Sequence, residues 1–217
     1  MIRIGVLVSG SGSNLQAILD AVAAKKLDAE IAVVVSNIAT AGGLERARAA
    51  GVTAVVIDHK GFANREDFDA ALVAELHQHQ VDYVVLAGFM RIVTEVLLGA
   101  FPMRVVNVHP ALLPAFPGVN AQKQAFNYGS RVSGCTVHFV DAGTDTGPVI
   151  AQAVVPVLDG DDEATLKDRI LVKEHALLPM ALQWIAEGRV AVKPPNAAGE
   201  RPRVTVEGIV PVLGLAT

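Results

Sequence analysis

The sequence lacks most of the features that mark secreted, membrane-bound or disulfide-rich proteins. It contains one cysteine, Cys135, which excludes an intramolecular disulfide and cannot by itself form a thiolate metal site. No apolar run reaches the roughly 18 residues needed to cross a bilayer, and the N-terminus has no signal-peptide pattern. We therefore expect a cytoplasmic protein with no membrane partner, in which Cys135 is a small buried strand residue.

Aromatic side chains and clustered positive charge are also scarce. Only 5% of the residues are aromatic, and the formal net charge is −4 without a basic stripe. This composition argues against a nucleic-acid partner and favours small-molecule chemistry. The 217 residues are 52% hydrophobic, which is enough for one domain with a substantial core.

Short β-branched runs alternate with segments of helical period along the first half of the chain. Strands are expected at 2–8, 31–36, 55–57, 83–87 and 105–108, and helices at 15–24, 43–50, 66–80 and 93–100. Several strands are apolar throughout, as expected for parallel strands covered on both faces by helices. The pattern predicts an α/β fold with an open, mostly parallel, doubly wound sheet. Ligands of such sheets bind beyond the carboxyl ends of the strands, so the loops after Val8, Ser36, Ala87 and Val108 should share one face.

The first expected strand runs into a glycine-rich segment, GSGSN at 10–14, that opens a helix. A helix N-terminus offers backbone N–H groups and a positive dipole end to a phosphate. A dinucleotide site would need a third glycine where Leu15 stands, and a triphosphate loop would need a lysine that is absent. A single phosphate monoester on Gly12, Ser13 and Asn14 fits better. The alternative is a tight turn in which Ser13 and Asn14 cap the helix.

The segment VVNVHPALLPAFP at 105–117 carries Asn107 and His109 from a strand end into a proline-rich loop. Residues i and i+2 of a strand share a face, so both side chains can point toward the ligand. An amide can donate to a developing oxyanion and an imidazole can transfer a proton, as acyl transfer to an amine requires. A lone histidine at a strand end is the alternative.

A second glycine-rich turn, at 140–148, lies between two apolar strands and contains Asp145. A carboxylate there can orient His109 and favour its imidazolium form. Asp145 is also a common type of turn residue. The segment GFMRIV at 88–93 suits either ordinary core or a slot for a flat heteroaromatic ligand. The last long helix is expected from Glu163, with a kink or break at Pro179.

Six segments together resemble one family. They are GSGSNLQAI, VVSNIATAGGLERA, LAGFMRIV, VVNVHPALLPAFPG, SGCTVHFVDAGTDTGPVI and VKEHALLP. The spacing of Asn107, His109 and Asp145 is typical of folate formyltransferases, and GSGSN with the later EH pair is similar to phosphoribosylglycinamide formyltransferase (glycinamide ribonucleotide transformylase). The resemblance implies a formyltransferase domain at 1–192, with a phosphate-binding half at about 1–100 and a folate and catalytic half at about 101–192. A tail at 193–217 can form short edge strands.

The implied reaction moves the formyl group of 10-formyltetrahydrofolate to the amine of 5-phosphoribosylglycinamide in purine biosynthesis. Asn107 would polarise the formyl oxygen, and His109, held cationic by Asp145, would stabilise the tetrahedral intermediate and donate a proton. The ribonucleotide would contact Gly12, Ser13, Asn14 and Glu174. The implied folate-binding residues are Arg65, Met90, Arg91, Ile92, Val93, Asn107, Asp141 and Asp145. No metal is implied, and the protein is expected to be a monomer or homodimer.

The resemblance leaves alternatives open. Ala111 stands where the family usually has serine, and Asn120 where some members have histidine, which affects hydrogen bonding near His109. A formyltetrahydrofolate hydrolase or a methionyl-tRNA formyltransferase is the nearest alternative. These usually carry an extra regulatory or RNA-binding domain, which we do not expect here. A non-catalytic nucleotide-binding module would explain GSGSN but not the Asn107, His109 and Asp145 set.

Overall fold

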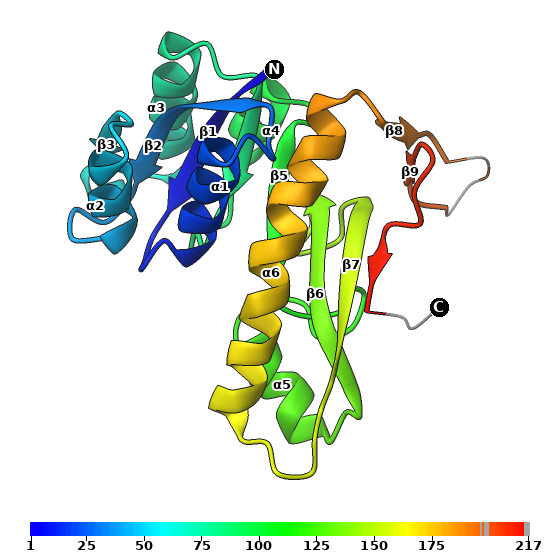
Figure 1. Ribbon diagram of the computed structural model, residues 1–217. Coiled ribbons are helices and arrows are strands. Elements are labelled where there is room, and N and C mark those ends of the chain that lie inside the picture. Colours follow the sequence, from blue (N-terminus) through cyan, green and yellow to red (C-terminus); the bar gives the residue numbers. More distant parts are fainter. Residues whose placement is uncertain (196, 198–199, 215–217) are drawn as a thin grey trace. The chain divides into compact units, whose positions relative to one another are not determined.

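The structure is a computed structural model that describes residues 1–195, 197 and 200–214 (Figure 1). The chain forms two compact units, Met1–Asn107 and Val108–Thr217. The boundary falls inside the strand that carries Asn107 and His109, so these two neighbours belong to different units.

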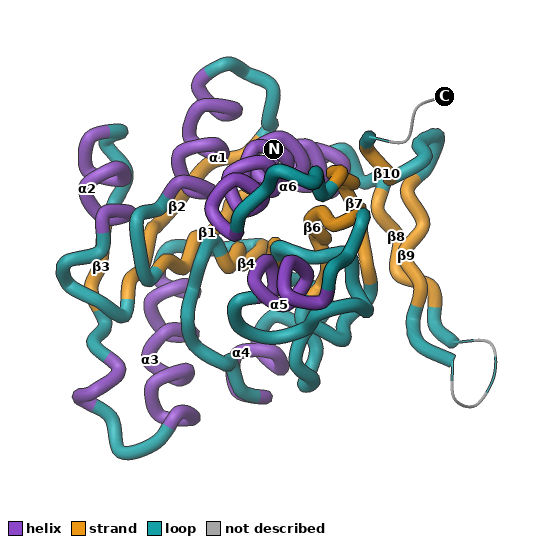
Figure 2. Tube along the Cα trace, turned by 90° about the horizontal axis from the view of Figure 1, so that it is seen from below, coloured by secondary structure: helices purple, strands orange, loops and turns teal. Residues whose placement is uncertain are grey.

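The first unit is built on a parallel sheet with the strand order β5-β4-β1-β2-β3. Its strands are β1 (Ile2–Val8), β2 (Ala29–Ser36), β3 (Ala54–Val56), β4 (Tyr83–Leu86) and β5 (Val105–His109). The intervening helices are α1 (Ser13–Ala23), α2 (Gly42–Ala49), the short 3-10 helix η1 (His59–Gly61), α3 (Arg65–Gln78) and α4 (Glu95–Ala100). Figure 2 shows α1 and α2 on one side of these strands and α3 and α4 on the other. The predicted α/β fold with a mostly parallel, doubly wound sheet is confirmed.

Burial explains why these segments fold as they do. β1 and β2 are buried along most of their length because helices cover both faces of the sheet. Helix α3 turns Phe68, Leu72 and Leu76 inward, as its sequence period predicts, and each is at most 2% exposed.

Hydrogen bonds hold together the loops that follow β1, β2 and β4. The Ser9 N–H donates to the Gly88 carbonyl (3.1 Å), and the Ser9 hydroxyl donates to Asn37 Oδ1 (2.6 Å). The Gly43 N–H donates to the Gly10 carbonyl (3.1 Å). The predicted gathering of these loops at the carboxyl edge of the sheet is therefore confirmed within the first unit.

In the second unit, β6 (Val132–Phe139) pairs antiparallel with β7 (Val149–Pro156), and β10 (Val212–Leu213) pairs parallel with β7. The helices are α5 (Ala121–Tyr128) and α6 (Glu163–Ala186), and α6 packs against β6 and β7 (Figure 1). Strands β8 (Val190–Lys193) and β9 (Arg203–Val206) form a separate antiparallel hairpin. The part of the chain after residue 193 thus contributes β9 and β10.

Helix α6 starts at a capping box in which Asp162 and Thr165 bond each other's backbone N–H groups. It continues through Pro179, so the helix does not break there, and a kink at that residue stays a prediction. Pro179 is buried within the apolar face of the helix, beside Leu178 and Leu182. Packing of this face offsets the loss of one backbone hydrogen bond, because tertiary contacts supply most of a helix's stability in a protein.

Candidate active site

His109 is the last residue of β5 and is only 4% exposed. Its Nε2 lies 2.8 Å from the carbonyl oxygen of Phe116, and its Nδ1 lies 3.3 Å from Oδ2 of Asp145. A carbonyl oxygen and an ionised carboxylate can only accept hydrogen bonds. Each ring nitrogen of His109 therefore faces an oxygen acceptor.

Asp145 is held in place by the loop between β5 and α5 as well as by His109. The Gly118 N–H donates to Asp145 Oδ2 at 2.7 Å, and Asp145 itself adopts a left-handed φ of 53°. This conformation is uncommon for a residue other than glycine, and such strain often accompanies functional positions. Within the turn at 140–148, the Thr146 hydroxyl donates to Asp141 Oδ1 at 2.6 Å. This bond links residues on either side of Asp145. The expected contact between His109 and Asp145 is present; its catalytic role stays a proposal.

His138, on β6, is a second histidine at this cluster that the sequence analysis did not single out. It is 1% exposed, and its Nε2 lies 3.7 Å from Asp145 Oδ1. Burial lowers the pKa of His138, against the opposing effects of the Phe139 carbonyl and Asp145. Its Nδ1 lies 2.8 Å from the Phe139 carbonyl, so the neutral ring donates from that nitrogen. In the sequence, His138 could have been noticed as the single histidine of an apolar strand that ends just before a glycine-rich turn.

Asn107 stands two residues before His109 on β5 and pairs with Leu86 of β4 in the first unit. Alternation along the strand places Asn107 and His109 on the same face of β5. Asn107 is partly exposed, whereas its neighbours Val106 and Val108 are buried. The side-chain amide of Asn107 is therefore accessible enough to contact a ligand.

The glycine-rich loop leads directly into α1. The helix begins at Ser13, and its N-cap is Gly12 in the left-handed region (φ 72°) without a side-chain cap hydrogen bond. Capping by Ser13 or Asn14, the alternative considered from the sequence, is therefore not what the structure shows. A Cβ on Gly12 would lie 2.5 Å from the Cα of Gly43, so only glycine fits this turn.

Arg46 of α2 contacts the same loop, which the sequence analysis did not anticipate. Its Nε donates to the Ser11 carbonyl (2.8 Å), and its Nη1 donates to Gln16 Oε1 (3.0 Å). The guanidinium adds a positive charge beside a helix N-terminus, which strengthens the attraction for a phosphate.

The predicted folate-binding segment forms the connection between β4 and α4. Met90 is 71% exposed and Ile92 is 62% exposed, while Arg91 and Val93 are half-buried. Core packing therefore does not explain Met90 and Ile92, and exposed apolar side chains at the ligand edge of a sheet suit a flat ligand. Arg65 is the exposed first residue of α3.

Glu174 lies on α6 and is 5% exposed. Burial, followed by the charge of Glu174, raises the pKa of the Cys135 thiol to about 12. Cys135 is fully buried, as predicted, and stays protonated. A thiol in this state is not a nucleophile.

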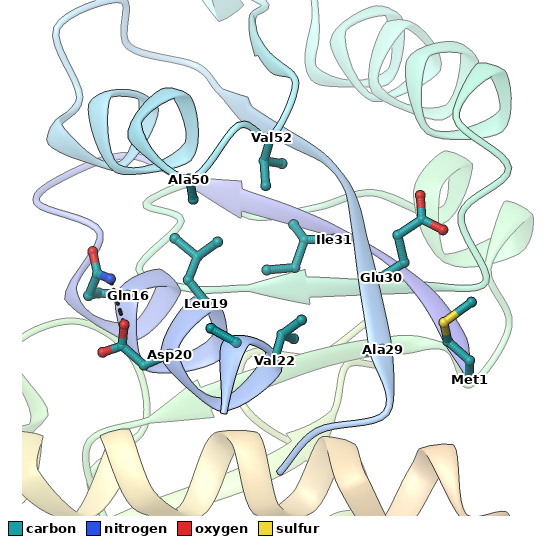
Figure 3. Close-up of a pocket in the computed structure, with 11 residues that line it drawn as sticks. Met1, Gln16, Leu19, Asp20, Val22, Ala29, Glu30, Ile31, Ala50 and Val52 are labelled. Atoms are coloured by element: carbon teal, nitrogen blue, oxygen red, sulfur yellow. Dashed lines mark hydrogen bonds between the residues drawn. The ribbon is translucent and has the colours of Figure 1, made fainter. Parts of the chain in front are cut away.

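A pocket of about 510 Å³ lies elsewhere in the first unit, between α1, β2 and the segment after α2 (Figure 3). Apolar side chains such as Leu19, Ile31 and Val52 line it, and Gln16 donates to Asp20 at 2.8 Å on one side. None of the predicted site residues lines this pocket. Within the described part of the chain, no helix is long and apolar enough to cross a membrane, and no cluster of three metal-binding side chains occurs.

Comparisons with known proteins converge on one family. Residues 2–182 match the family model described as formyl transferase. The phosphoribosylglycinamide formyltransferase of Escherichia coli is 44% identical over 188 residues, which cover 87% of this chain and 89% of that protein. The corresponding protein of Bacillus subtilis is 38% identical over 185 residues, which cover 85% and 95%.

Solved structures and longer relatives agree with this match. The crystal structure of glycinamide ribonucleotide transformylase 1 from Symbiobacterium toebii has a TM-score of 0.89 and 52% identity, over 95% of this chain and 94% of that one. The trifunctional purine biosynthetic protein adenosine-3 of Drosophila melanogaster is 47% identical over 194 residues, 88% of this chain. The chain spans only 14% of the length of that trifunctional relative.

Proposed function

The chain belongs to the formyl transferase family and, within it, to the phosphoribosylglycinamide formyltransferases, and from this premise we propose that it transfers the formyl group of 10-formyltetrahydrofolate to the amine of 5-phosphoribosylglycinamide. This reaction is a step of de novo purine biosynthesis. The observation that carries the proposal is His109, buried with acceptors at both ring nitrogens and two residues after Asn107 on one strand.

The amine nitrogen of the ribonucleotide attacks the formyl carbon, and the carbonyl oxygen becomes an oxyanion. The Asn107 amide donates to this oxyanion, and the His109 imidazolium stabilises its charge. Nε2 of His109 is engaged by Phe116 at 2.8 Å, whereas the 3.3 Å contact of Nδ1 with Asp145 is longer than a usual charge-assisted hydrogen bond. The Nδ1–H group is therefore the one that can turn toward the substrate.

Collapse of the tetrahedral intermediate breaks the bond between the formyl carbon and N10 of the folate. N10 takes up a proton, for which His109 is the donor, and the proton that the attacking nitrogen loses returns His109 to its imidazolium form. The products are N-formylated ribonucleotide and tetrahydrofolate. These steps use no covalent enzyme intermediate.

Asp145 favours the imidazolium form of His109 before the proton is transferred. The turn and the Gly118 N–H fix its carboxylate, so little reorganisation is needed when the oxyanion forms. His138 is neutral because burial lowers its pKa. The negative charge of Asp145 is therefore left to act on His109.

Substrate binding is assigned to two groups of residues. The phosphate binds at the start of α1, on Gly12, Ser13 and Asn14, with Arg46 adding positive charge, and Glu174 contacts the ribonucleotide. The folate binds along Met90, Arg91, Ile92 and Val93 and the turn of Asp141 and Asp145, with Arg65 near its acidic portion. The uncapped N-terminus of α1 and the exposure of Met90 and Ile92 support this assignment.

The test is incubation of the purified protein with 10-formyltetrahydrofolate, with and without the ribonucleotide, while folate absorbance is followed. We expect formyl loss only when the amine is present. Equal formyl loss without the amine would identify a formyltetrahydrofolate hydrolase. Formyl transfer to methionyl-tRNA but not to the ribonucleotide would identify a methionyl-tRNA formyltransferase. No reaction would favour a nucleotide-binding module. The 1–192 domain with its 193–217 tail, a cytoplasmic location and a monomeric or homodimeric state remain predictions.

A further inference from the structure

Asp69 of α3 is a buried carboxylate that the proposed chemistry does not use. It is 1% exposed, although it lies in the same helix as the exposed acidic residues Glu66 and Asp67. We propose that Asp69 is a positioning residue that fixes the folate-binding segment 88–94 through Thr94, and this inference rests on the proposed function.

The contact between Asp69 and Thr94 is short and buried. Asp69 Oδ2 accepts the Thr94 N–H at 2.5 Å, and the Thr94 hydroxyl donates to the same carboxylate. Thr94 is also the N-cap of α4, where its hydroxyl oxygen accepts the Val96 N–H at 3.3 Å. Asp69 thus fixes the point at which the folate-binding segment ends and α4 begins.

The other end of the segment is fixed as well. The Met90 N–H donates to the Ser9 hydroxyl at 2.8 Å, and this hydroxyl donates onward to Asn37 Oδ1 at 2.6 Å. The rings of Phe68 and Phe89 stack with centroids 6.5 Å apart and planes 14° from parallel. Residues 91–93 therefore lie between two fixed points, which reduces the ordering that a bound ligand must impose.

A purely structural role explains this carboxylate less well. Burial raises the pKa of Asp69, and the two hydrogen bonds from Thr94 oppose that shift only in part. A neutral residue would fill the position without the cost of desolvating a charge. An ionised acceptor makes a stronger hydrogen bond to the Thr94 N–H than a neutral one, which is useful where a loop must be held rigid.

The test compares Asp69→Ala, Asp69→Asn and the matched control Asp67→Asn, which changes an exposed carboxylate two positions earlier in the same helix. For Asp69→Ala we expect the KM for 10-formyltetrahydrofolate to rise about tenfold, the effect of losing one charge-assisted hydrogen bond. The KM for the ribonucleotide and kcat should change less than twofold. Asp69→Asn should recover most of the affinity because its amide oxygen still accepts the Thr94 N–H, and Asp67→Asn should match the wild type.

Calorimetric titration with tetrahydrofolate separates this inference from the proposed function. If the wild type binds no folate, the proposed function fails. If the wild type binds and Asp69→Ala binds equally tightly, or if both substrates weaken in parallel with a lower Tm, the positioning role is overturned. Should Asp69→Ala not fold, Thr94→Ala decides: it keeps the Thr94 N–H bond to Asp69, removes the hydroxyl contacts with Asp69 and with the Val96 N–H, and should raise the same KM by a smaller factor, whereas no change would contradict the proposal.

Discussion

Nδ1 of His109 and Oδ2 of Asp145 lie 3.3 Å apart, while the other ring nitrogen of His109 faces the Phe116 carbonyl at 2.8 Å. The two acceptors face opposite sides of the ring, so together they fix its orientation. The same Asp145 oxygen accepts the Gly118 N–H, which means that the carboxylate stays in place even if His109 is removed. The pair can therefore be dissected by substitution without collapse of the loop.

We expect His109→Ala and Asp145→Asn each to lower kcat by about 10²–10⁴, the usual range for loss of a proton-transferring group. In Asp145→Asn the neutral amide removes the negative charge that faces Nδ1 of His109, so the proposed proton donor loses its charged partner. The double variant should lose little more kcat than either single variant, because His109 and Asp145 act as a unit. Steady-state kinetics give the factors, and circular dichroism should show an unchanged fold. Additive losses would contradict the joint role.

Asn107→Leu removes the amide while keeping nearly the same volume. We expect kcat to fall by about 10²–10³, as for removal of one oxyanion donor, with both KM values nearly unchanged. The reason is that the amide bond to the oxyanion exists only in the transition state. A higher KM at constant kcat would instead make Asn107 a ground-state binding residue.

Gly12→Ala tests the phosphate loop, and Gly51→Ala is its matched control. Both glycines have φ 72°, so alanine at either costs roughly 1–2 kcal/mol of backbone strain. Nothing lies within 4 Å of a Cβ on Gly51, whereas a Cβ on Gly12 would lie 2.5 Å from the Cα of Gly43. We expect Gly51→Ala to lower Tm slightly with normal kinetics, and Gly12→Ala to lower it further and raise the KM for the ribonucleotide. Equal kinetics in the two variants would argue against a phosphate site at this loop.

Local features of the sequence predicted most of the fold. The run at 2–8 matches β1 to the residue, and the other strands and the α-helices of the first unit begin and end within two residues of the predicted bounds, whereas η1 was not predicted. Continuous apolar runs and glycine turns act over a few residues, so they can be recognised without the rest of the chain. The chain does not break at Pro179 because the packing that keeps α6 continuous comes from strands distant in sequence, which local features of the sequence do not show.

The candidate site was less accessible to sequence reasoning. Residue types and spacing indicated Asn107, His109 and Asp145, but not the Phe116 carbonyl that faces Nε2 of His109. The identity of a residue does not show where its backbone carbonyl points, so a backbone acceptor cannot be predicted from residue types. Arg46 was missed for a similar reason, since an arginine on an exposed helix resembles any surface charge until the structure brings it to Ser11.

His138 provides a test of the electrostatics of the cluster by the pH dependence of stability. Burial lowers the pKa of His138 in the folded state. Below the ordinary histidine pKa of about 6.5, His138 therefore binds a proton in the unfolded chain more readily than in the folded protein. This contribution to stability is complete above about pH 6.5 and is lost as the pH falls through the lowered folded-state pKa. His138→Gln cannot be protonated, so its unfolding free energy should fall less than that of the wild type between pH 7.5 and 5.5.

Urea unfolding of the wild type and His138→Gln at these two pH values gives the comparison, and the other histidines cancel in the difference. The decisive feature is the sign of the difference between the wild type and the variant in their change of unfolding free energy, because a His138 that was charged in the folded state would reverse that sign. In that case the wild type would gain stability relative to the variant on acidification, and Asp145 would be shared between two cations. A smaller fall in the variant would instead support a neutral His138 and leave His109 as the charged partner of Asp145.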